Sequence, residues 1–427
     1  MKIAIIGGGI SGLTAAYLLH RQHKIRLFEA GKIGGHSDTV EVDGEGVDLG
    51  FIVYNEKTYP LFTGLLAELR VDTQPSEMTL SVREEGRALE WNGSTLRQVF
   101  GQPRNLLRPS HWSMVRDILR FHRKADAYLL ESDDTTLGDA LDRDRYSTVF
   151  AERYLLPMIG AVWSTPPGDM RRFPLRPLIA FLANHGMLQV NHRPQWRTVR
   201  GGSRRYVEAL TATFRDRICD HTPVRWIRRG DRETGGAGIT VRAAGREPER
   251  FDQVILAVHS DQALRLLADP SPAEKSILGA IPYRPNDTIL HRDLRMLPER
   301  RQLWASWNVS TRGDGSGDSG GVRVTYWMNR LQNLTSERPL CVTLNRTDEI
   351  EPVQVLERRT FSHPQFDGPA LAAQRRWREI SGVAGTHFCG AYWGYGFHED
   401  GVRSAVRVAD ALGVGWSAAT SPRMAAS

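Results

Sequence analysis

The residues with the clearest chemical spacing are a glycine-rich turn and an acid close to the N-terminus. Gly7, Gly9 and Gly12 form a G-x-G-x-x-G pattern, and Glu29 follows 17 positions after the last of them. In such a pattern Gly7 permits a tight turn, Gly9 lets a diphosphate approach the backbone, and Gly12 lets a helix pack closely. Glu29 stands where a ribose hydroxyl needs a carboxylate acceptor, and its charge would repel a 2′-phosphate. The pattern predicts a dinucleotide site that disfavours NADP.

These residues need a strand, a turn, a helix and a second strand to bring them together. Residues 2–6 have the length and β-branching of a buried strand, and a helix is predicted from Leu13 to about Gln22. The helix N-terminus, next to Ser11, offers free N–H groups and a partial positive charge to a diphosphate. A second strand over residues 25–28 ends directly before the acid. This order is that of a Rossmann-type nucleotide-binding lobe.

The overall composition is that of an ordinary globular protein. The chain has 427 residues, which is too long for one simple core, so two lobes are expected. Its net charge is +7, and only six of the 56 basic residues are lysines. Such a balance can attract anionic lipid or acidic substrates, or it can reflect an arginine-rich composition without a specific partner. Nucleic acid is not expected as a partner, because no recognised binding motif accompanies the charge.

Cysteine usage and hydropathy predict a cytoplasmic protein. Cys219, Cys341 and Cys389 lie far apart and form neither a C-x-x-C pair nor a metal-ligand pattern, so free thiols and no metal are expected. The first predicted strand begins at Lys2, so no signal peptide is expected before it. No run of 18 apolar residues exists that would span a membrane.

Residues 97–124 form a strongly basic segment. They hold seven arginines and lysines against one acid, Asp117, with aromatic and aliphatic residues interleaved. An amphipathic segment of this kind can lie on an anionic membrane, which would place the protein at the inner face of the membrane as a peripheral protein. The alternative, which the sequence favours, is a helical cap whose apolar face is core and whose arginines are solvated.

A second glycine loop distinguishes FAD from NAD. Gly34 and Gly35, flanked by Lys32 and His36, resemble the R-x-G-G-R element of the flavin amine oxidase and phytoene desaturase superfamily. In that superfamily the loop meets the FAD diphosphate, so the resemblance implies FAD as the cofactor. Lys32 keeps a positive charge but lacks the guanidinium fork of arginine. His36 carries no fixed charge, so it lacks the permanent cation that the second arginine offers a phosphate.

Three further segments follow the order of the same superfamily. A D-x-G element ends at Gly50, and its counterpart lies near the isoalloxazine ring. A strand at Val224 corresponds to one that touches adenine through its backbone. Near the C-terminus, a glycine turn and the next helix correspond to contacts with the ribityl-diphosphate and the flavin C2 carbonyl, where the helix dipole would stabilise reduced flavin. The resemblance implies these further cofactor contacts: Gly50, Phe51, Ile52, Val224, Gly390, Gly401 and Val402.

The resemblance also implies the fold and its division into lobes. The expected fold class is α/β, with a Rossmann-like FAD-binding lobe of glutathione-reductase-like, amine oxidase topology and a discontinuous α+β substrate lobe. Residues 1–75, 195–275 and 365–427 are expected to form the FAD-binding domain. Residues 76–194 and 276–364 are expected to form the substrate-binding domain.

Five residues are candidates for the catalytic site. Tyr392, Trp393 and Tyr395 lie in an aromatic and glycine-rich stretch and can wall a dry pocket that holds a substrate carbon over flavin N5. They can equally belong to the core. Asn184 and His185 follow an apolar run, so either can line the substrate pocket or serve a structural role.

The closer resemblance is to a bacterial subgroup of amine-oxidase-like FAD-binding proteins. Genes of this subgroup often accompany relatives of cyclopropane-fatty-acid synthase, which implies a lipid acyl substrate and a lipid methyltransferase partner. The marks of the subgroup are the stretches 34–39, 50–55, 183–186, 193–199, 326–330 and 388–401.

The distribution of lysine argues against amine oxidation. Many amine oxidases of the superfamily place a lysine near flavin N5, but this chain has none from Ala125 to Glu274 and none after Lys275. It also has no obvious acidic cluster to recognise a cationic amine. We therefore expect an FAD-dependent oxidoreductase that dehydrogenates, desaturates or isomerises a hydrophobic substrate. The alternatives are a flavin-dependent amine oxidase and a non-catalytic, flavin-holding accessory subunit of a lipid methyltransferase.

Overall fold

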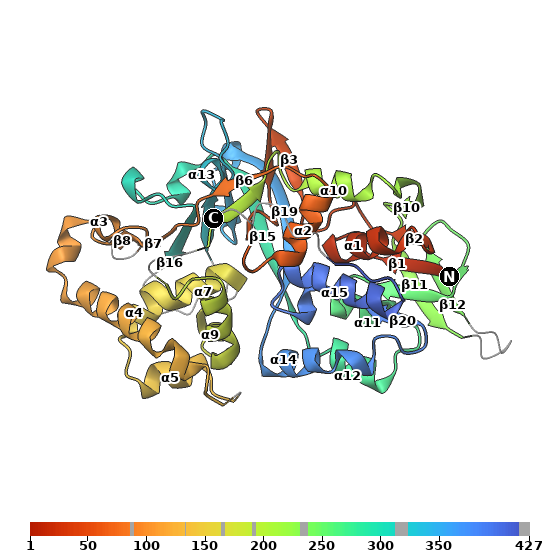
Figure 1. The fold of residues 1–427 in the computed structure, drawn as a ribbon. Coiled ribbons are helices and arrows are strands. Elements are labelled where there is room, and N and C mark those ends of the chain that lie inside the picture. Colours follow the sequence, from red (N-terminus) through yellow and green to blue (C-terminus); the bar gives the residue numbers. More distant parts are fainter. Residues whose placement is uncertain are drawn as a thin grey trace.

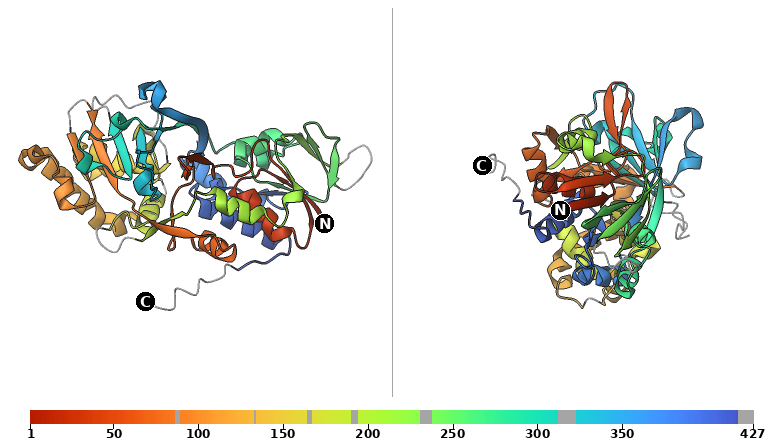
Figure 2. Two further views of the ribbon diagram at one scale, coloured as in Figure 1. Left: turned by 90° about the horizontal axis from the view of Figure 1, so that it is seen from above. Right: turned by 90° about the vertical axis from the view of Figure 1, so that its right-hand side faces the viewer.

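The computed structural model describes residues 1–85, 89–132, 134–163, 167–189, 194–230, 238–311 and 323–417. The elements form two groups that lie next to each other (Figure 1). One group is built on a parallel sheet that contains the N-terminal strand. The other is built on a larger, mostly antiparallel sheet and a set of helices, and the left view in Figure 2 shows the long axis of the molecule running through both groups.

The parallel sheet has the strand order β10-β2-β1-β14-β20. Ile5 of β1 lies opposite Leu27 of β2 on one side and Ile255 of β14 on the other. All of its pairings are parallel, as expected for a sheet covered on both faces. The strands are β1 (Lys2–Ile6), β2 (Lys24–Phe28), β10 (Ile218–Cys219), β14 (Gln253–Leu256) and β20 (Thr386–Phe388).

Apolar side chains alternate between the two faces of this sheet. Ile3 and Ile5 join a core with the helices α1 (Ile10–Leu19), α2 (Pro60–Glu68), α10 (Arg204–Thr211) and α15 (His398–Ala411). Ala4 and Ile6 join the core on the opposite face. That second core is formed with α11 (Ser260–Leu266), α12 (Pro272–Leu278), α14 (Gly368–Arg375) and the antiparallel strands β11 (Val224–Arg229), β12 (Ile239–Ala243) and β13 (Glu249–Phe251).

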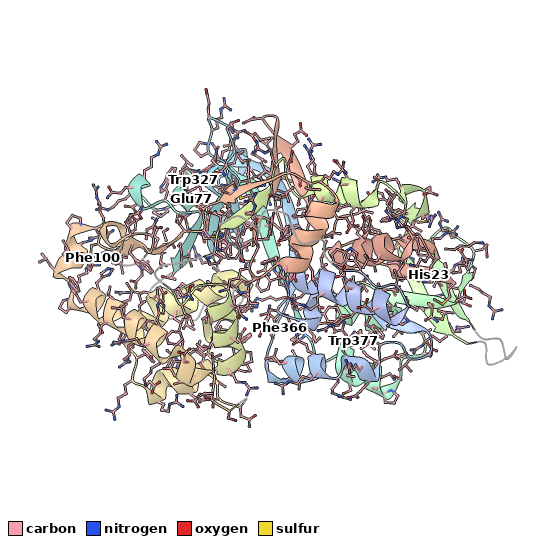
Figure 3. The ribbon with its side chains drawn as sticks, viewed as in Figure 1. His23, Glu77, Phe100, Trp327, Phe366 and Trp377 are labelled. Carbon is pink, nitrogen blue, oxygen red and sulfur yellow. The ribbon has the colours of Figure 1, made fainter. Side chains whose placement is uncertain are left out.

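Helix α1 begins inside the glycine turn, three residues earlier than the sequence predicted. Nine of its ten residues are buried, and Tyr17 is the exception. Trp377, labelled in Figure 3, ties the end of the chain to the parallel sheet by donating its indole N–H to the carbonyl of Phe388 at 2.8 Å. Helix α15 packs beside α1, because both helices contribute side chains to the same core.

The larger sheet has seven strands in the order β19-β15-β18-β17-β16-β7-β8. Only the β16–β7 pair is parallel among the pairs of this described sheet. The long β15–β19 pair runs from this sheet toward the parallel sheet, as the centre of Figure 1 shows. The strands are β7 (Leu80–Glu84), β8 (Leu89–Asn92), β15 (Tyr283–His291), β16 (Trp307–Thr311), β17 (Val324–Trp327), β18 (Cys341–Leu344) and β19 (Val355–Pro364).

Helices cover one side of this sheet and form a core of their own. Phe366, labelled in Figure 3, joins that core from the segment between β19 and α14. The helical segments are α3 (Leu96–Val99), η2 (Pro103–Leu107), α4 (Pro109–Tyr128), α5 (Leu137–Arg143), α6 (Thr148–Phe150), a π-helical turn (Ala151–Leu155), α7 (Leu156–Trp163), α8 (Pro167–Met170) and α9 (Leu175–Asn184).

Two small sheets lie at the junction of the two groups. One is the hairpin of β3 (Thr39–Val42) and β4 (Glu45–Asp48). The other has the order β5-β9-β6, from β5 (Tyr54–Asn55), β9 (Trp196–Val199) and β6 (Thr73–Ser76). The described residues contain no helix long and apolar enough to cross a membrane.

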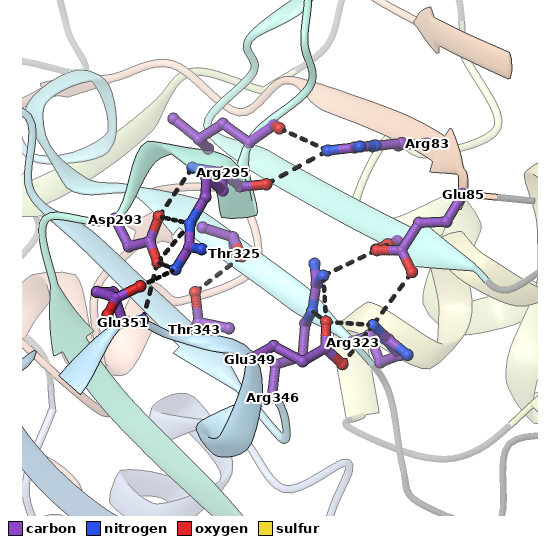
Figure 4. A network of polar contacts seen from close by, with 12 residues as sticks. Arg83, Glu85, Asp293, Arg295, Arg323, Thr325, Thr343, Arg346, Glu349 and Glu351 are labelled. Carbon is purple, nitrogen blue, oxygen red and sulfur yellow. Dashed lines mark hydrogen bonds and ion pairs between the residues drawn. The ribbon is translucent and has the colours of Figure 1, made fainter. Parts of the chain in front are cut away.

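Ion pairs between arginine and glutamate side chains connect segments next to the strands of the seven-stranded sheet (Figure 4). Arg346 and Arg323, each 6% exposed, contact Glu85 and Glu349. The two shortest of these contacts join Arg323 Nη2 to Glu349 Oε1 and Arg346 Nη2 to Glu349 Oε2, each at 2.6 Å. Because each buried cation has its carboxylates, removing one partner would leave an uncompensated charge. This network stabilises the sheet and lies apart from the cavity described below.

Candidate active site

One cavity of about 1010 Å³ connects the glycine turn with the helical core of the second group. Its nucleotide end is lined by Gly7, Gly9, Ser11, Glu29, Gly35 and His36. Its far end is lined by apolar residues of α4, α7, the seven-stranded sheet and the segment before β7, which include Met78, Leu80, Trp91, Met114, Ile118 and Tyr326. The structure thus brings the predicted dinucleotide motif and a large apolar space into one site.

The geometry at the three motif glycines fits the roles that the sequence predicts for them. Gly7 has φ +108°, and a Cβ there would lie 2.4 Å from the carbonyl oxygen of Ala257. A Cβ at Gly12 would lie 1.9 Å from the carbonyl oxygen of Gly7, so this glycine packs against protein and does not line the cavity. A Cβ at Gly9 would meet no described atom within 4 Å. Gly9 therefore offers open backbone to a diphosphate, and the cradle fits the FAD that the motifs imply.

The Glu29 carboxylate is fixed at the nucleotide end by two backbone N–H groups. Gly8 N donates to Oε2 at 2.7 Å, and Gly31 N donates to Oε1 at 2.8 Å. Both bonds orient the carboxylate while the side chain still lines the cavity. A carboxylate held in this way can accept hydrogen bonds from ribose hydroxyls.

We expect Glu29→Ala to weaken FAD binding by about 1–3 kcal/mol, the range for a hydrogen bond to a charged group. Titration of the apoprotein with FAD, followed by quenching of flavin fluorescence, measures the change. Glu41→Ala is the matched control, because Glu41 is exposed and does not line the cavity. Equal FAD affinity of wild type and Glu29→Ala would place the ribose contact elsewhere.

The second glycine loop packs directly on the first. Gly34 and Gly35 have φ +123° and +58°, and a Cβ on Gly35 would lie 3.0 Å from the Cα of Gly9. His36 lines the cavity beside them, whereas Lys32 is exposed and lies off the cavity wall. Gly34 also lies off the wall, because it packs against the backbone of Ser37. The positive charge of Lys32, which was expected near the diphosphate, therefore does not line the cavity.

His36 belongs to a group of histidines drawn from distant parts of the chain. Its ring centroid lies 6.2 Å from that of His259, 5.3 Å from that of His363 and 5.0 Å from that of Phe361. Burial, and next the neighbouring histidines, holds the pKa of His36 well below its usual value. The imidazole is accordingly neutral near pH 7 and offers a hydrogen bond in place of the guanidinium charge. Sequence reasoning missed His259 and His363, because no local pattern links residues so far apart.

The stretch from Gly50 to Ile52 forms a rigid wall of the cavity. Phe51 N donates to the carbonyl of His36 at 2.8 Å, and Thr198 Oγ1 donates to the carbonyl of Ile52 at 2.8 Å. A Cβ on Gly50 would lie 2.2 Å from the carbonyl oxygen of His36, so only glycine fits. All three predicted residues of this stretch line the cavity.

The D-x-G aspartate, Asp48, is a buried anchor behind this wall. Its carboxylate accepts hydrogen bonds from Thr39 Oγ1 at 2.6 Å, Ser203 N at 2.8 Å and Gln332 Nε2 at 2.8 Å. Burial raises the pKa of Asp48 to about 6, against the lowering effect of these hydrogen bonds. The glycine pair Gly201 and Gly202, both with positive φ, brings the Ser203 amide to the carboxylate.

We expect Asp48 to make the stability of the apoprotein depend on pH. Its pKa is higher in the folded chain than the value of about 3.9 in the unfolded one. Its contribution to the free energy of unfolding is therefore fully present below pH 4. As the pH rises through about 6, roughly 3 kcal/mol of this contribution is lost. Urea unfolding should show that the free energy of unfolding of the wild type, relative to that of Asp48→Asn, falls by this amount between pH 4 and pH 7. An advantage that stays constant over this range would contradict the raised pKa.

The C-terminal aromatic stretch divides between the cavity and the core. Tyr392 and Gly390 line the cavity. Trp393 is 8% exposed and packs in the core beneath the parallel sheet, off the cavity wall. Tyr395 packs on Phe181 with ring centroids 5.5 Å apart and also lies off the wall. The expectation that Trp393 and Tyr395 wall the pocket is thus not met, because the turn between Gly390 and Gly396 directs them into packing.

Three further predicted cofactor residues lie off the cavity wall: Gly401, Val402 and Val224. A Cβ on Gly401 would lie 2.8 Å from Ile10 Cγ2, so this glycine allows α15 to pack against the start of α1. Val402 is fully buried in the same core. Val224 begins β11 in the separate three-stranded sheet. Their cofactor contacts remain predictions.

His398 and Phe51 form a stacked pair that the sequence did not indicate as a functional unit. Their ring centroids lie 3.6 Å apart, and both residues line the cavity. The Nε2 atom of His398 lies 3.0 Å from both Ser37 Oγ and Tyr206 OH. Burial lowers the pKa of His398 to about 3, so the ring is neutral at physiological pH. The pair is a flat, uncharged surface beside the nucleotide end.

The structure separates the two polar candidates of α9. His185 lines the cavity, its Nδ1 lies 2.9 Å from the carbonyl of Phe181, and its ring stacks on Phe181 at 3.9 Å. Burial lowers the pKa of His185 to about 4. Asn184, the last residue of α9, is exposed and does not line the cavity. His185 is thus available as a neutral wall residue, and Asn184 is not.

Fold and site together define a flavoprotein with a Rossmann-type lobe. The model of the family described as flavin containing amine oxidoreductase matches residues 10–291. The chain belongs to this family, and the predictions of an enzyme and of FAD as its cofactor are confirmed.

Solved structures of the same fold cover almost the whole chain. Putrescine oxidase bound to putrescine matches with a TM-score of 0.69 and 16% identity, over 97% of this chain and 99% of that one. A CLA-producing fatty acid isomerase from P. acnes matches with a TM-score of 0.70 and 13% identity, over 96% of this chain and 98% of that one. The predicted α/β fold of amine oxidase type is confirmed. Among curated relatives, prenylcysteine oxidase 1 of Bos taurus is 45% identical over 53 residues, which are 12% of this chain and 10% of that protein.

Proposed function

We propose that this FAD-dependent oxidoreductase acts on a hydrophobic substrate, a lipid acyl chain, by dehydrogenation, desaturation or flavin-mediated isomerisation. The observation that carries the proposal is the character of the cavity. Among the described residues that line it, there is no lysine, arginine or aspartate. Its far end is instead lined by side chains such as Met78, Leu80, Met114 and Ile118, which favour an apolar chain.

A cationic amine would find no unoccupied carboxylate on the described cavity wall. The two glutamates there are Glu29 and Glu77. Glu29 accepts two backbone hydrogen bonds at the nucleotide end. Glu77, labelled in Figure 3, pairs with Arg330 at 2.5 Å. These contacts favour the hydrophobic substrate over the amine of the alternative hypothesis.

Two tyrosines supply polar positions in this apolar space. Tyr59 and Tyr326 line the cavity and are 3% and 8% exposed. Burial raises the pKa of both phenols, so they stay protonated and can donate to a carboxyl or carbonyl group. Such donors would fix the polar end of a substrate while the apolar wall excludes water.

Bound FAD supplies N5 as a hydride acceptor. The chain's own contribution is to hold a carbon near that position in a dry space. Phe51, Tyr392 and Phe397 line the cavity and exclude water there. The relatives of the same fold include both an amine oxidase and a fatty acid isomerase, and the apolar cavity is the observation that supports the acyl substrate.

Anaerobic stopped-flow reduction of the holoenzyme tests the proposal. We expect long-chain fatty acids or phospholipids to bleach the flavin or to yield double-bond isomers detected by gas chromatography, and putrescine to do neither. Bleaching by amines alone would establish the amine oxidase alternative. If light reduces the flavin but no lipid or amine reduces it or is converted by the protein, the accessory-subunit hypothesis is favoured. Co-purification with a lipid methyltransferase would then identify the partner.

A further inference from the structure

Helix α4 presents a stripe of exposed apolar and basic side chains. The α4 stripe consists of Trp112, Arg116, Leu119 and Arg123, whose spacing of four, three and four residues places them on one face. Trp112 is 50% exposed and Leu119 is 49% exposed, while the Arg116 side chain is 70% exposed. The opposite face, which includes Met114 and Phe121, is buried. The helix is therefore covered on one face only.

The preceding turn η2 extends this surface with two leucines. Leu106 and Leu107 are 52% and 86% exposed. The Trp112 indole donates to the carbonyl of Leu106 at 2.9 Å, and the Phe100 ring lies 4.7 Å from that of Trp112. Phe100 is at the outer edge of the molecule in Figure 3. Four of the ten exposed large hydrophobic side chains in the described part of the chain thus gather on η2 and α4.

The charge of this surface is predominantly positive, although Asp126 is exposed near the C-terminal end of α4. Asp117, the single acid of residues 97–124, is fully buried. It accepts from Ser147 N at 2.9 Å and lies 3.5 Å from Arg120. Arg120 is also held, with its guanidinium 4.0 Å from the Tyr146 ring. Arg116 of the α4 stripe also lies 3.6 Å from Asp117, but its side chain is 70% exposed, and Arg123 is exposed as well, so both can meet an external anion.

The same helix forms part of the cavity wall. Val115, Ile118 and His122 line the cavity, and so does Leu119 of the α4 stripe. Because Leu119 is half exposed and also lines the cavity, the cavity reaches the surface at this helix. The exposed leucines and the apolar end of the cavity are therefore neighbours.

We propose that η2 and the α4 stripe dock on the surface of an anionic lipid bilayer. The leucines and Trp112 would enter the headgroup boundary, and Arg116 and Arg123 would pair with lipid phosphates. The charge of the stripe selects an anionic bilayer over an uncharged protein surface. An acyl substrate would then reach the cavity beside Leu119 without crossing water, a consequence that rests on the proposed function, whereas the docking itself does not.

Vesicle sedimentation of the FAD-loaded protein tests the docking without any turnover. We expect binding to vesicles of phosphatidylglycerol and phosphatidylcholine at low salt, weaker binding at high salt, and little binding to phosphatidylcholine alone. Each arginine near such a surface contributes about 1 kcal/mol, so Arg116→Gln/Arg123→Gln should bind roughly thirtyfold more weakly. Arg246→Gln/Arg265→Gln is the matched control, because it removes the same charge from exposed positions elsewhere.

An environment-sensitive dye reports where the bilayer touches. Dye attached at Leu107→Cys, in a Cys219→Ser background, should shift to the blue on anionic vesicles, and dye at the equally exposed Val353→Cys should not. Equal vesicle binding of the two arginine double variants, or equal dye shifts at both positions, would overturn the proposal. A wild-type protein that binds no vesicles would also overturn it. If sedimentation velocity showed a wild-type dimer and the Arg116→Gln/Arg123→Gln variant were a monomer, the partner of this surface would be a second copy of the chain, which would overturn the proposal as well.

Discussion

Gly9→Ala should fold like the wild type and lose most of its FAD. Gly9 has φ −79° and ψ −177°, a conformation that alanine adopts without strain, and a Cβ there would touch no described atom within 4 Å. The added methyl group would instead occupy the space that a diphosphate needs at the end of α1. Overpacking of this kind costs about 1–3 kcal/mol, so FAD affinity should fall between about fivefold and more than a hundredfold. Flavin titration of the apoprotein beside a thermal melt measures both properties.

Substitutions at two other glycines serve as comparisons for Gly9→Ala. Gly368→Ala is the matched control, because a Cβ there also meets no described atom within 4 Å and the position lies at the start of α14, away from the cavity. It should leave FAD affinity and the melting temperature unchanged. Gly12→Ala should lower the melting temperature of the apoprotein, because its Cβ would lie 1.9 Å from the Gly7 oxygen. Full FAD affinity in Gly9→Ala would remove the first glycine turn from the diphosphate site.

Ala161→Phe should stop turnover of a long acyl substrate while FAD stays bound. Ala161 lies on α7, is 2% exposed, and lines the apolar end of the cavity together with Trp91 and Tyr326. A phenyl ring there would fill the space in which a chain must lie. Displacing a reacting carbon by about 1 Å can cost about a hundredfold in rate, and we expect at least that loss in flavin reduction or isomer formation.

The conservative variant Ala161→Ser distinguishes obstruction of the substrate space from a general disturbance of the fold by substitution at this position. It adds one small atom, so it should keep most of the rate and all of the flavin. The ratio of flavin to protein absorbance checks cofactor content in both variants, and rapid mixing measures the rate. If Ala161→Phe turned over the long substrate at the wild-type rate, the substrate would have to bind outside the apolar end.

The nucleotide-binding part was predictable because its signals are local. Gly7, Gly9 and Gly12 reveal a turn through their spacing, and Glu29 follows within one strand. The start of α1 at Ile10 was predicted three residues late, because a glycine-rich sequence hides the first helical turn. The fold of the second group was predictable only by resemblance.

The cavity wall was less predictable, because long-range packing decides which side chains reach it. The ring at Tyr392 lines the cavity and that at Trp393 does not, although they are adjacent. No local pattern distinguishes them, since the direction depends on how the turn after Gly390 meets α15. The histidines at 36, 259 and 363 likewise meet only when three distant segments fold together.

The order of strands in the parallel sheet has a consequence for the synthesis of this protein. β1 and β2 leave the ribosome first, but β14 and β20, which complete their sheet, come from the middle and the last part of the chain. The free edge of β1 therefore stays unpaired until β14 is made, after more than half of the polypeptide, and β20 can pair with β14 only near the end of synthesis. Contacts this distant in sequence form slowly. We expect flavin loading to be a post-translational event, and nascent chains of this protein to depend on chaperones until α15 docks on α1.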